Sequence, residues 1–262
     1  MKTTLITGAT SGIGMATAKL FATKGHRLIL CGRRAERLVE LKNELNTPVH
    51  TLSFDVRNRE DVFKEINSIP LEFKNINILL NNAGNAHGLS TIQDGNMDDW
   101  DAMMDGNVKG LLYVTKAILP GMIERNSGFV VNIGSVAAMT GQPFISAYCV
   151  SKGALATLTR NTAFALLKNK IRVNQLNIGW MGSDGEHEIQ TKYHGAEDNW
   201  LDKAGKEQPS GRLLSPEEVS KAVSFLASED SGMMTGSVVN FDQSVWGGYP
   251  FAPPTPEEKM TV

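Results

Sequence analysis

The sequence has little of what disulfide-bonded, metal-binding and membrane-spanning proteins depend on. It contains only two cysteines, Cys31 and Cys149, which we expect to be buried thiols in a reducing compartment. Its five histidines are scattered without the spacing of zinc ligands, so we expect no metal. No run of about 18 apolar residues occurs, which predicts that no segment spans a membrane. We therefore expect a cytoplasmic protein.

The chain also has no large excess of positive or negative charge. The chain carries 26 basic and 28 acidic side chains, and its longest basic run is Arg33-Arg34. This balance gives no sign of a nucleic-acid partner. Met1 and Lys2 lead directly into an apolar strand, so we expect no signal peptide. At 262 residues with 41% hydrophobic content, one α/β domain with a single large core is the expected size.

Apolar strands alternate with amphipathic helices along most of the chain. Continuous alternation of this kind predicts a doubly wound parallel sheet with helices on both faces, and ligands that bind outside the carboxyl ends of the strands. The predicted strands are 3–7, 27–31, 49–54, 76–80, 128–133, 171–177 and 237–241. The predicted helices are 13–24, 35–45, 59–69, 100–123, 147–167 and 215–227.

Two stretches depart from this rhythm. Residues 180–214 contain aromatic residues and glycines with weak periodicity, which predicts a long loop of the kind that is usually functional or disordered, or a contact between subunits. Residues 250–262 are rich in proline and are predicted to form a surface tail. We therefore assign residues 1–249 to a single domain.

A glycine-rich turn joins the first strand to the first helix. It reads Gly8-Ala9-Thr10-Ser11-Gly12-Ile13-Gly14, with the spacing GxxxGxG. A helix N-terminus presents free N–H groups and its positive dipole end, and glycines let the backbone approach an anion closely. This pattern favours a pyrophosphate site, although a turn without a ligand would have the same sequence.

Tyr148 and Lys152 are four residues apart in a predicted helix and therefore lie on one face. An ammonium beside a phenol favours the phenolate, so we expect Lys152 to lower the pKa of Tyr148 from about 10. Such a tyrosine can exchange a proton with an alcohol oxygen. Ser135 precedes Tyr148 by thirteen residues and could hydrogen-bond the same oxygen. The pair alone is equally compatible with an exposed lysine and a half-buried tyrosine.

Taken together, these motifs resemble the short-chain dehydrogenase/reductase family from about residue 3 to about residue 242. The resemblance implies a Rossmann fold and catalysis by Asn107, Ser135, Tyr148 and Lys152. It also implies that residues at about 180–214 close over the substrate as a lid. In this family the asparagine kinks a helix and holds a water linked to the lysine, whereas on sequence alone Asn107 could simply bond to the backbone. The motifs that carry the resemblance are Thr7 to Gly14, Asp55-Val56, Asn81 to Gly84, Asn107, Ser135 and the Tyr148/Lys152 pair.

The resemblance also implies which residues bind a nicotinamide cofactor. Asp55 would accept from the adenine amino group, although a turn or N-cap aspartate is equally plausible. Lys152 would grip the nicotinamide ribose. The implied cofactor contacts are Gly8, Thr10, Ser11, Gly12, Ile13, Gly14, Asp55, Val56, Asn82, Ala83, Gly84, Tyr148, Lys152, Gly179 and Ser183.

The end of the second strand indicates which cofactor is used. NAD sites place an acidic residue there, but this chain has Gly32-Arg33-Arg34 and no carboxylate before Glu36. Two guanidinium groups can each bind a phosphate in a forked geometry. Arg33 and Arg34 therefore predict NADP (NADPH) as the cofactor.

The substrate is less well defined by the sequence. The N-terminal half resembles the NADP-dependent serine and 3-hydroxy acid dehydrogenase branch, whereas the part beyond Tyr148 is more similar to sugar and polyol dehydrogenases or acyl reductases. We expect a small polar alcohol or carbonyl compound, namely a hydroxy acid, polyol or sugar. The alternatives are a reductase of bulkier ketones and a non-catalytic NADP(H) sensor. Candidate contacts for a polar substrate are His87, Gln142, Trp180, His187 and Arg212.

The sequence departs from the family pattern at two places. Ile178-Gly179 replaces the usual Pro-Gly, and Asp242-Gln243-Ser244 replaces the usual Asp-Gly-Gly, so the nicotinamide pocket need not have the usual shape.

Helices 100–123 and 147–167 carry more apolar positions than one buried stripe needs. In the family these helices pair across two-fold axes, which predicts a dimer or homotetramer. The apolar positions include Met103, Met104, Leu111, Leu112, Leu155 and Phe164.

Overall fold

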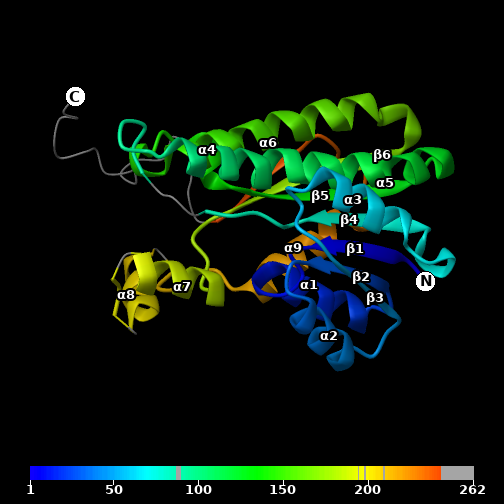
Figure 1. Ribbon diagram of the computed structural model, residues 1–262, viewed down its shortest axis with the longest axis horizontal. Coiled ribbons are helices and arrows are strands. Elements are labelled where there is room, and N and C mark those ends of the chain that lie inside the picture. The colour runs from blue at the N-terminus through cyan, green and yellow to red at the C-terminus, as the bar shows by residue number, and fades with distance from the viewer. Residues whose placement is uncertain (87–89, 194, 198, 209, 243–262) are drawn as a thin grey trace.

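The computed structural model describes residues 1–86, 90–193, 195–197, 199–208 and 210–242 of the chain. Within these residues, one parallel sheet has the strand order β3-β2-β1-β4-β5-β6-β7 (Figure 1). This order confirms the predicted doubly wound architecture. The strands are β1 Thr3–Thr7, β2 Arg27–Gly32, β3 Val49–Ser53, β4 Ile76–Asn81, β5 Gly128–Ser135, β6 Ile171–Ile178 and β7 Val238–Phe241.

Helices cover both faces of the sheet (Figure 1). On one face, Ile6, Leu28 and Leu80 pack against α1 Gly12–Thr23, α2 Ala35–Glu44 and α9 Pro216–Leu226. On the other, Leu5, Ile29 and Leu79 pack against α3 Arg59–Asn67, α5 Leu111–Arg125 and α6 Ser146–Ala165. Neighbouring strand residues thus enter opposite cores, which explains why the strands read as continuous apolar runs. No helix in the described part of the chain is long and apolar enough to cross a membrane.

The helix predicted at 100–123 has a different form in the structure. A π-helical segment, Asp105–Gly110, separates α4 Met97–Met104 from α5. Asn107 lies in this segment, where its side chain bonds the backbone of Asn85 and the hydroxyl of Ser151. Apolar periodicity does not reveal an inserted residue of this kind, whereas the family resemblance implied an irregular helix at Asn107, and such bulges often occur at functional sites.

Residues 180–214 contain two short helices, α7 Asp184–Tyr193 and α8 Trp200–Glu207, which corrects the expectation of an irregular loop. A β-bridge between Met181 and Leu214 joins the two ends of this segment. The predicted tail 250–262 lies outside the described residues.

A chain of buried amide and hydroxyl groups links four neighbouring strands. Each bond in it is between 2.7 and 3.2 Å long, and the side chains belong to β4, β5, α6, β6 and β7. Buried polar groups are costly unless they are paired, so this chain favours a single register of the strands. Its members in order are Asn81, Asn132, Thr159, Gln175, Asn177 and Asn240.

Gly134 in β5 provides the space that this chain occupies. A Cβ atom at this position would overlap Asn177 Oδ1 and Gln175 Nε2, which bond to each other. We predict that Gly134→Ala lowers the free energy of unfolding by about 1–3 kcal/mol, because it overpacks the site and leaves buried amides unpaired. Urea unfolding measures the effect. Gly141→Ala is the control, because a Cβ at Gly141 meets nothing within 4 Å. Equal midpoints for the two variants would contradict the prediction.

Candidate active site

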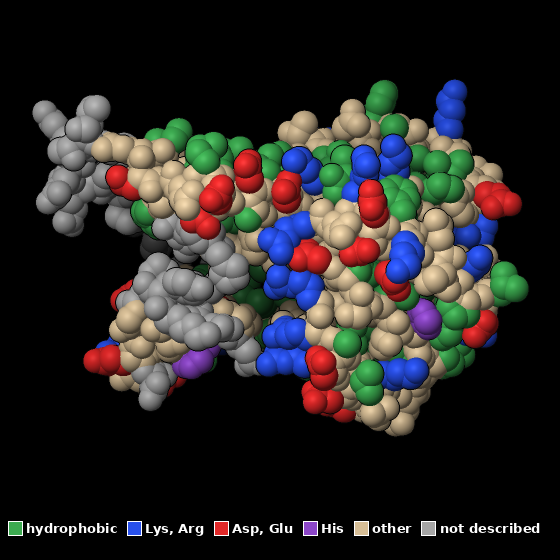
Figure 2. Space-filling model, in the orientation of Figure 1, with side chains coloured by type: hydrophobic (Ala, Val, Ile, Leu, Met, Phe, Trp, Pro, Cys, Tyr) green, Lys and Arg blue, Asp and Glu red, His purple; other side chains and the backbone are tan. Residues whose placement is uncertain are grey.

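A pocket opens beyond the carboxyl ends of the first four strands, where the fold predicts a ligand site. Figure 2 shows a hollow on this face between the regions of α4 and of α7 and α8, with Lys and Arg side chains along its inner edge. Most of the predicted cofactor residues line the pocket, namely Gly8, Thr10, Ser11, Gly12, Ile13, Arg33, Arg34, Asp55, Val56, Asn82, Ala83 and Gly84.

The glycine-rich turn forms one wall of the pocket. Gly8 and Gly12 have φ of +64° and +50°, a backbone conformation that glycine adopts without strain. A Cβ at Gly14 would overlap the Gly8 carbonyl, so this glycine lets α1 start directly against the turn. Asn82 Nδ2 donates to the carbonyls of Thr7 and Gly8 at 3.1 and 3.0 Å. The N-terminus of α1 is therefore held beside the pocket, where its dipole favours an anion.

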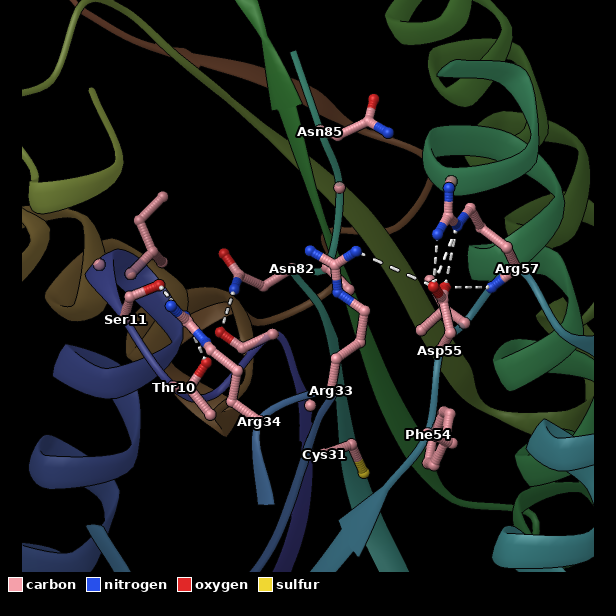
Figure 3. Close-up of a pocket in the computed structure, with 18 of the residues that line it drawn as sticks. Thr10, Ser11, Cys31, Arg33, Arg34, Phe54, Asp55, Arg57, Asn82 and Asn85 are labelled. Atoms are coloured by element: carbon pink, nitrogen blue, oxygen red, sulfur yellow. Dashed lines mark hydrogen bonds and ion pairs between the residues drawn. The ribbon is translucent and has the colours of Figure 1, made fainter. Parts of the chain in front are cut away.

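Arginines surround the end of the pocket at β2 and β3 (Figure 3). Arg34 turns back to the glycine-rich turn and donates to Thr10 Oγ1 at 2.8 Å. Arg33 extends toward Asp55, and its side chain is 69% exposed. Arg57 also lines the pocket, although the sequence analysis did not select it. Arg33 and Arg57 thus lie beside the Asp55 carboxylate, whereas Arg34 lies at the glycine-rich turn.

Asp55 is held by Arg57 in several ways. The Arg57 backbone N–H donates to Asp55 Oδ1 at 3.0 Å, and Arg57 Nη2 donates to Oδ2 at 2.7 Å. Burial raises the pKa of Asp55, but the hydrogen bonds and charge of Arg57 outweigh it, and the net pKa is lowered. Asp55 is thus both a turn residue and a pocket residue, so both interpretations drawn from the sequence fit its position. Arg57 could have been selected from the sequence because it lies two positions after an aspartate at the end of a strand.

Ser135, Tyr148 and Lys152 meet where β5 ends against α6. Ser135 is the last residue of β5, and its hydroxyl lies within hydrogen-bonding reach of the Tyr148 phenol. Lys152 Nζ is 5.5 Å from the centre of the Tyr148 ring and donates to the Ile133 carbonyl at 3.0 Å. The structure therefore brings together the three residues that the sequence spacing selected.

The expected lowering of the tyrosine pKa is wrong for this structure. Burial raises the pKa of Tyr148, the bond to Ser135 lowers it, and the negative charge of Glu186 raises it, with a net increase. Lys152 is itself buried, which lowers its pKa to about 8. Its ammonium is directed at the Ile133 carbonyl. Burial disfavours the charged form of both side chains and outweighs their mutual attraction.

Asn107 connects this group to the pocket. Its Oδ1 accepts from the Asn85 backbone N–H at 2.8 Å, and its Nδ2 donates to the Asn85 carbonyl and to Ser151 Oγ, each at 3.0 Å. A Cβ on Gly84 would lie 2.8 Å from Asn107 Oδ1 and 3.8 Å from Lys152 Nζ. Asn107, Gly84 and Lys152 are thus close neighbours. The water that would link Asn107 to the lysine stays a prediction.

Five predicted cofactor residues lie outside the pocket lining, namely Gly14, Tyr148, Lys152, Gly179 and Ser183. Gly179 packs against the Asp242 side chain. Ser183 Oγ accepts from the Glu186 backbone N–H at 3.2 Å, and a Cβ on Gly12 would lie 3.9 Å from the Ser183 Cβ. Ser183 is therefore near the glycine-rich turn, and the cofactor roles of all five residues stay predictions.

The candidate substrate residues have varied environments. Arg212 pairs with Glu218 through two 2.7 Å bonds, which gives it a structural role. Trp180 and His187 belong to the helical segment 180–214. The carbonyl of Gln142 accepts from the Ile145 N–H at 3.4 Å. His87 lies outside the described residues. Asn85 and Met181 line the pocket and were not selected from the sequence.

Comparison with known proteins identifies the family. Residues 2–194 match the family model for short chain dehydrogenases. The chain is 38% identical over 223 residues to NADP-dependent 3-hydroxy acid dehydrogenase YdfG of Salmonella typhi, covering 85% of this chain and 88% of that one. It is 43% identical over 178 residues to sulfoacetaldehyde reductase 2 of Chromohalobacter salexigens, covering 67% and 71%.

Solved structures agree with this assignment. The closed form of serine dehydrogenase complexed with NADP+ superposes with a TM-score of 0.84 at 32% identity, covering 98% of this chain and 100% of that one. NAD+-bound xylitol dehydrogenase superposes with a TM-score of 0.85 at 31% identity, covering 92% and 97%. The chain therefore belongs to the short chain dehydrogenase family and is an oxidoreductase.

Proposed function

We propose that the protein is an NADP-dependent oxidoreductase that interconverts a small polar alcohol and its carbonyl compound. Hydroxy acids, polyols and sugars are the substrates in question. The observation that carries the proposal is the meeting of Ser135, Tyr148, Lys152 and Asn107 beside a pocket whose other end is lined by arginines. A panel of such alcohols and carbonyl compounds, followed by the absorbance of NADPH, tests it. No turnover with any compound would refute it.

The pocket residues fit an anionic dinucleotide. Gly8 and Gly84 let Asn82 and Asn107 pack closely against the pocket wall, since a Cβ on either glycine would lie 2.8 Å from an amide atom of these side chains. The N-terminus of α1 offers backbone N–H groups, and Arg33 and Arg34 supply cations at the β2 end. When bound, NADP(H) supplies or accepts the hydride. NADP appears in the names of a relative and of a structural neighbour, and the two arginines also favour NADP over NAD.

The remaining chemistry is assigned to side chains of this chain. Tyr148 moves the proton at the reacting oxygen, and Ser135 hydrogen-bonds the same oxygen. Because the pKa of Tyr148 is raised, the phenol stays protonated at neutral pH and is ready to donate to a carbonyl oxygen. Lys152 places a cation beside the phenol, and Asn107 positions the lysine and the loop that contains Gly84.

We further propose that residues 1–249 act as one cytoplasmic unit, with 180–214 as the lid, that associates into a dimer or homotetramer through α5 and α6. Leu112 and Phe164 are 40% and 80% exposed, which supports this. Met103, Leu111 and Leu155, which the sequence analysis counted toward the same surface, are instead buried within the chain. A monomer by light scattering at micromolar concentration would contradict self-association.

The first prediction concerns the proton donor. Tyr148→Phe keeps the ring but removes the hydroxyl, so turnover should fall at least ~10²–10⁴-fold, the contribution of general acid–base catalysis. Affinity for NADPH, measured by fluorescence titration, should change little. Tyr113→Phe is the matched control. Retention of activity within a few-fold of the parent would exclude Tyr148 as the donor.

The second prediction concerns cofactor choice. The Arg33→Ser/Arg34→Ser variant should lose most of the preference for NADPH over NADH, because each charge-assisted bond to phosphate contributes roughly 1.5–3 kcal/mol. Two such bonds allow a preference of about a hundredfold in dissociation constant, and added salt should weaken it. The control is Arg37→Ser, an exposed arginine of α2 that does not line the pocket. Matching titration curves for both cofactors in the parent would contradict the assignment.

The third prediction concerns the stability cost of Lys152. Its pKa is lowered from 10.5 to about 8, so at pH 7 its buried charge costs about 3 kcal/mol, offset by about 1 kcal/mol from the bond to Ile133. Lys152→Met should therefore raise the free energy of unfolding of the cofactor-free protein by about 2 kcal/mol at pH 7, while activity is lost.

The pH dependence provides a check on this prediction. Between pH 8 and 10.5 the unfolded chain holds more protons on Lys152 than the native chain, so the stability of the parent rises with pH. Lys152→Met lacks this rise, and the gap between the two proteins should narrow from pH 7 to pH 10 in urea unfolding. Lys116→Met, which alters an exposed lysine of α5, serves as control. A constant gap would show that burial of the charge is not the cause.

A further inference from the structure

The carboxylate of Asp55 lies at the end of the pocket where the 2′-phosphate of NADP is expected to bind. Asp55 and Arg33 both line the pocket, and Arg33 Nη1 lies 3.9 Å from Asp55 Oδ2 (Figure 3). An aspartate is ionised at neutral pH, so its carboxylate repels a phosphate that approaches through a site of reduced dielectric constant. A pocket that selects NADP must offset this negative charge.

Arg57 occupies the hydrogen-bonding positions of this carboxylate. Its Nε donates to both Asp55 oxygens at 3.1 Å, and its Nη2 donates to Oδ2 at 2.7 Å. The Arg57 backbone N–H donates to Oδ1 at 3.0 Å. A carboxylate has about four acceptor positions, and these bonds account for them. Arg57 therefore both cancels the charge of Asp55 and uses up its capacity to bind another cation.

The turn between β3 and α3 holds Arg57 in place. The Asn58 backbone N–H donates to the Asp55 carbonyl at 3.0 Å, and Asn58 Oδ1 accepts from the backbone N–H groups of Glu60 and Asp61 at the start of α3. The Arg57 backbone is thereby kept beside Asp55. This arrangement reduces the entropy that the two side chains lose when they pair.

Arg33 is left without a hydrogen bond to Asp55. The separation of 3.9 Å exceeds hydrogen-bonding range, and the Arg33 guanidinium makes no hydrogen bond to any residue that the structure describes. If Arg57 were replaced, the freed acceptor positions would draw Arg33 toward Asp55 and away from a ligand. Arg57 therefore keeps the donors of Arg33 open to a bound anion.

A surface ion pair that stabilises the turn would account for the contact between Asp55 and Arg57 but not for its location. Exposed ion pairs contribute little to folding stability. Both side chains line the pocket, beside the two arginines that the sequence analysis selected for the 2′-phosphate. We therefore expect the pair to affect the ligand more than the fold.

We propose that Arg57 is a third determinant of cofactor choice, because it cancels the charge of Asp55 and so keeps Arg33 available for the 2′-phosphate. The proposal rests on the NADP-dependent function proposed above. Arg57 acts in it as a positioning residue, through Asp55 and Arg33, and needs no contact of its own with the phosphate. Its effect should therefore depend on whether residue 55 carries a charge.

A double-mutant cycle provides the test. The measured quantity is the ratio of the Kd of NADH to the Kd of NADPH, from fluorescence titrations at low salt. Arg57→Gln should lower this ratio about tenfold, mainly through weaker binding of NADPH, because it leaves an unpaired carboxylate near the phosphate. Arg57→Gln/Asp55→Asn should restore the ratio to within about threefold of the parent, because both charges are then removed.

The ratio also cancels any weaker binding of adenine that Asp55→Asn causes, since the two cofactors share the adenine. Arg59→Gln is the control, because it removes the charge of an exposed arginine two positions further along that does not line the pocket. This variant should have the same ratio as the parent.

An unchanged ratio in Arg57→Gln would overturn the proposal. So would a ratio that stays low in Arg57→Gln/Asp55→Asn, since that result would mean that Arg57 itself binds the phosphate. Failure of the function proposed above has a different signature. In that case the parent itself would bind NADH as tightly as NADPH, or would turn over no compound of the wider panel.

Discussion

The hydrogen-bonded amide chain across β4, β5, β6 and β7 is the constraint on which the site depends. It pairs Asn132 with Thr159 and joins Gln175 to Asn177 in the space left by Gly134. Apolar packing alone leaves parallel strands free to adopt other registers, whereas a slipped register would leave several buried amides unpaired. In the observed register Ser135 lies opposite Ile178, so the ends of β5 and β6 open on the same edge.

The π-helical segment around Asn107 is a second constraint, and it joins this edge of the sheet to the helices. Without it, α4 and α5 would form one regular helix, and the Asn107 side chain would lack the position from which it bonds Asn85 and Ser151. Those two bonds link the loop after β4 to α6, the helix that carries Tyr148 and Lys152. The irregular turn costs local helical stability, but the buried amide is satisfied through side-chain bonds. The site is thus built from one constraint in the sheet and one in the helices.

The fold was predictable because its signals are local. The apolar strands, the glycine-rich turn and the spacing of Tyr148 and Lys152 each follow from residues that are adjacent or one helical turn apart. The features that the sequence analysis missed depend on contacts between distant segments. The π-helical segment requires the loop at Asn85, and the pocket position of Arg57 requires the turn after β3. The helices of residues 180–214 are linked by the contact of Trp180 with Trp200. Periodicity carries no information about any of these contacts.

The pKa of Tyr148 shows how a correct motif can lead to a wrong electrostatic conclusion. Four-residue spacing places a lysine near a phenol, but burial of the phenol decides the direction in which the pKa of the tyrosine moves. Here burial disfavours the charge on Lys152 and on the phenolate at once, and Glu186 adds to the effect at Tyr148. Because the pKa of Lys152 falls only to about 8, the lysine still carries its charge at pH 7, so the motif supplies the cation that the sequence predicted while burial sets the direction of the shift at Tyr148.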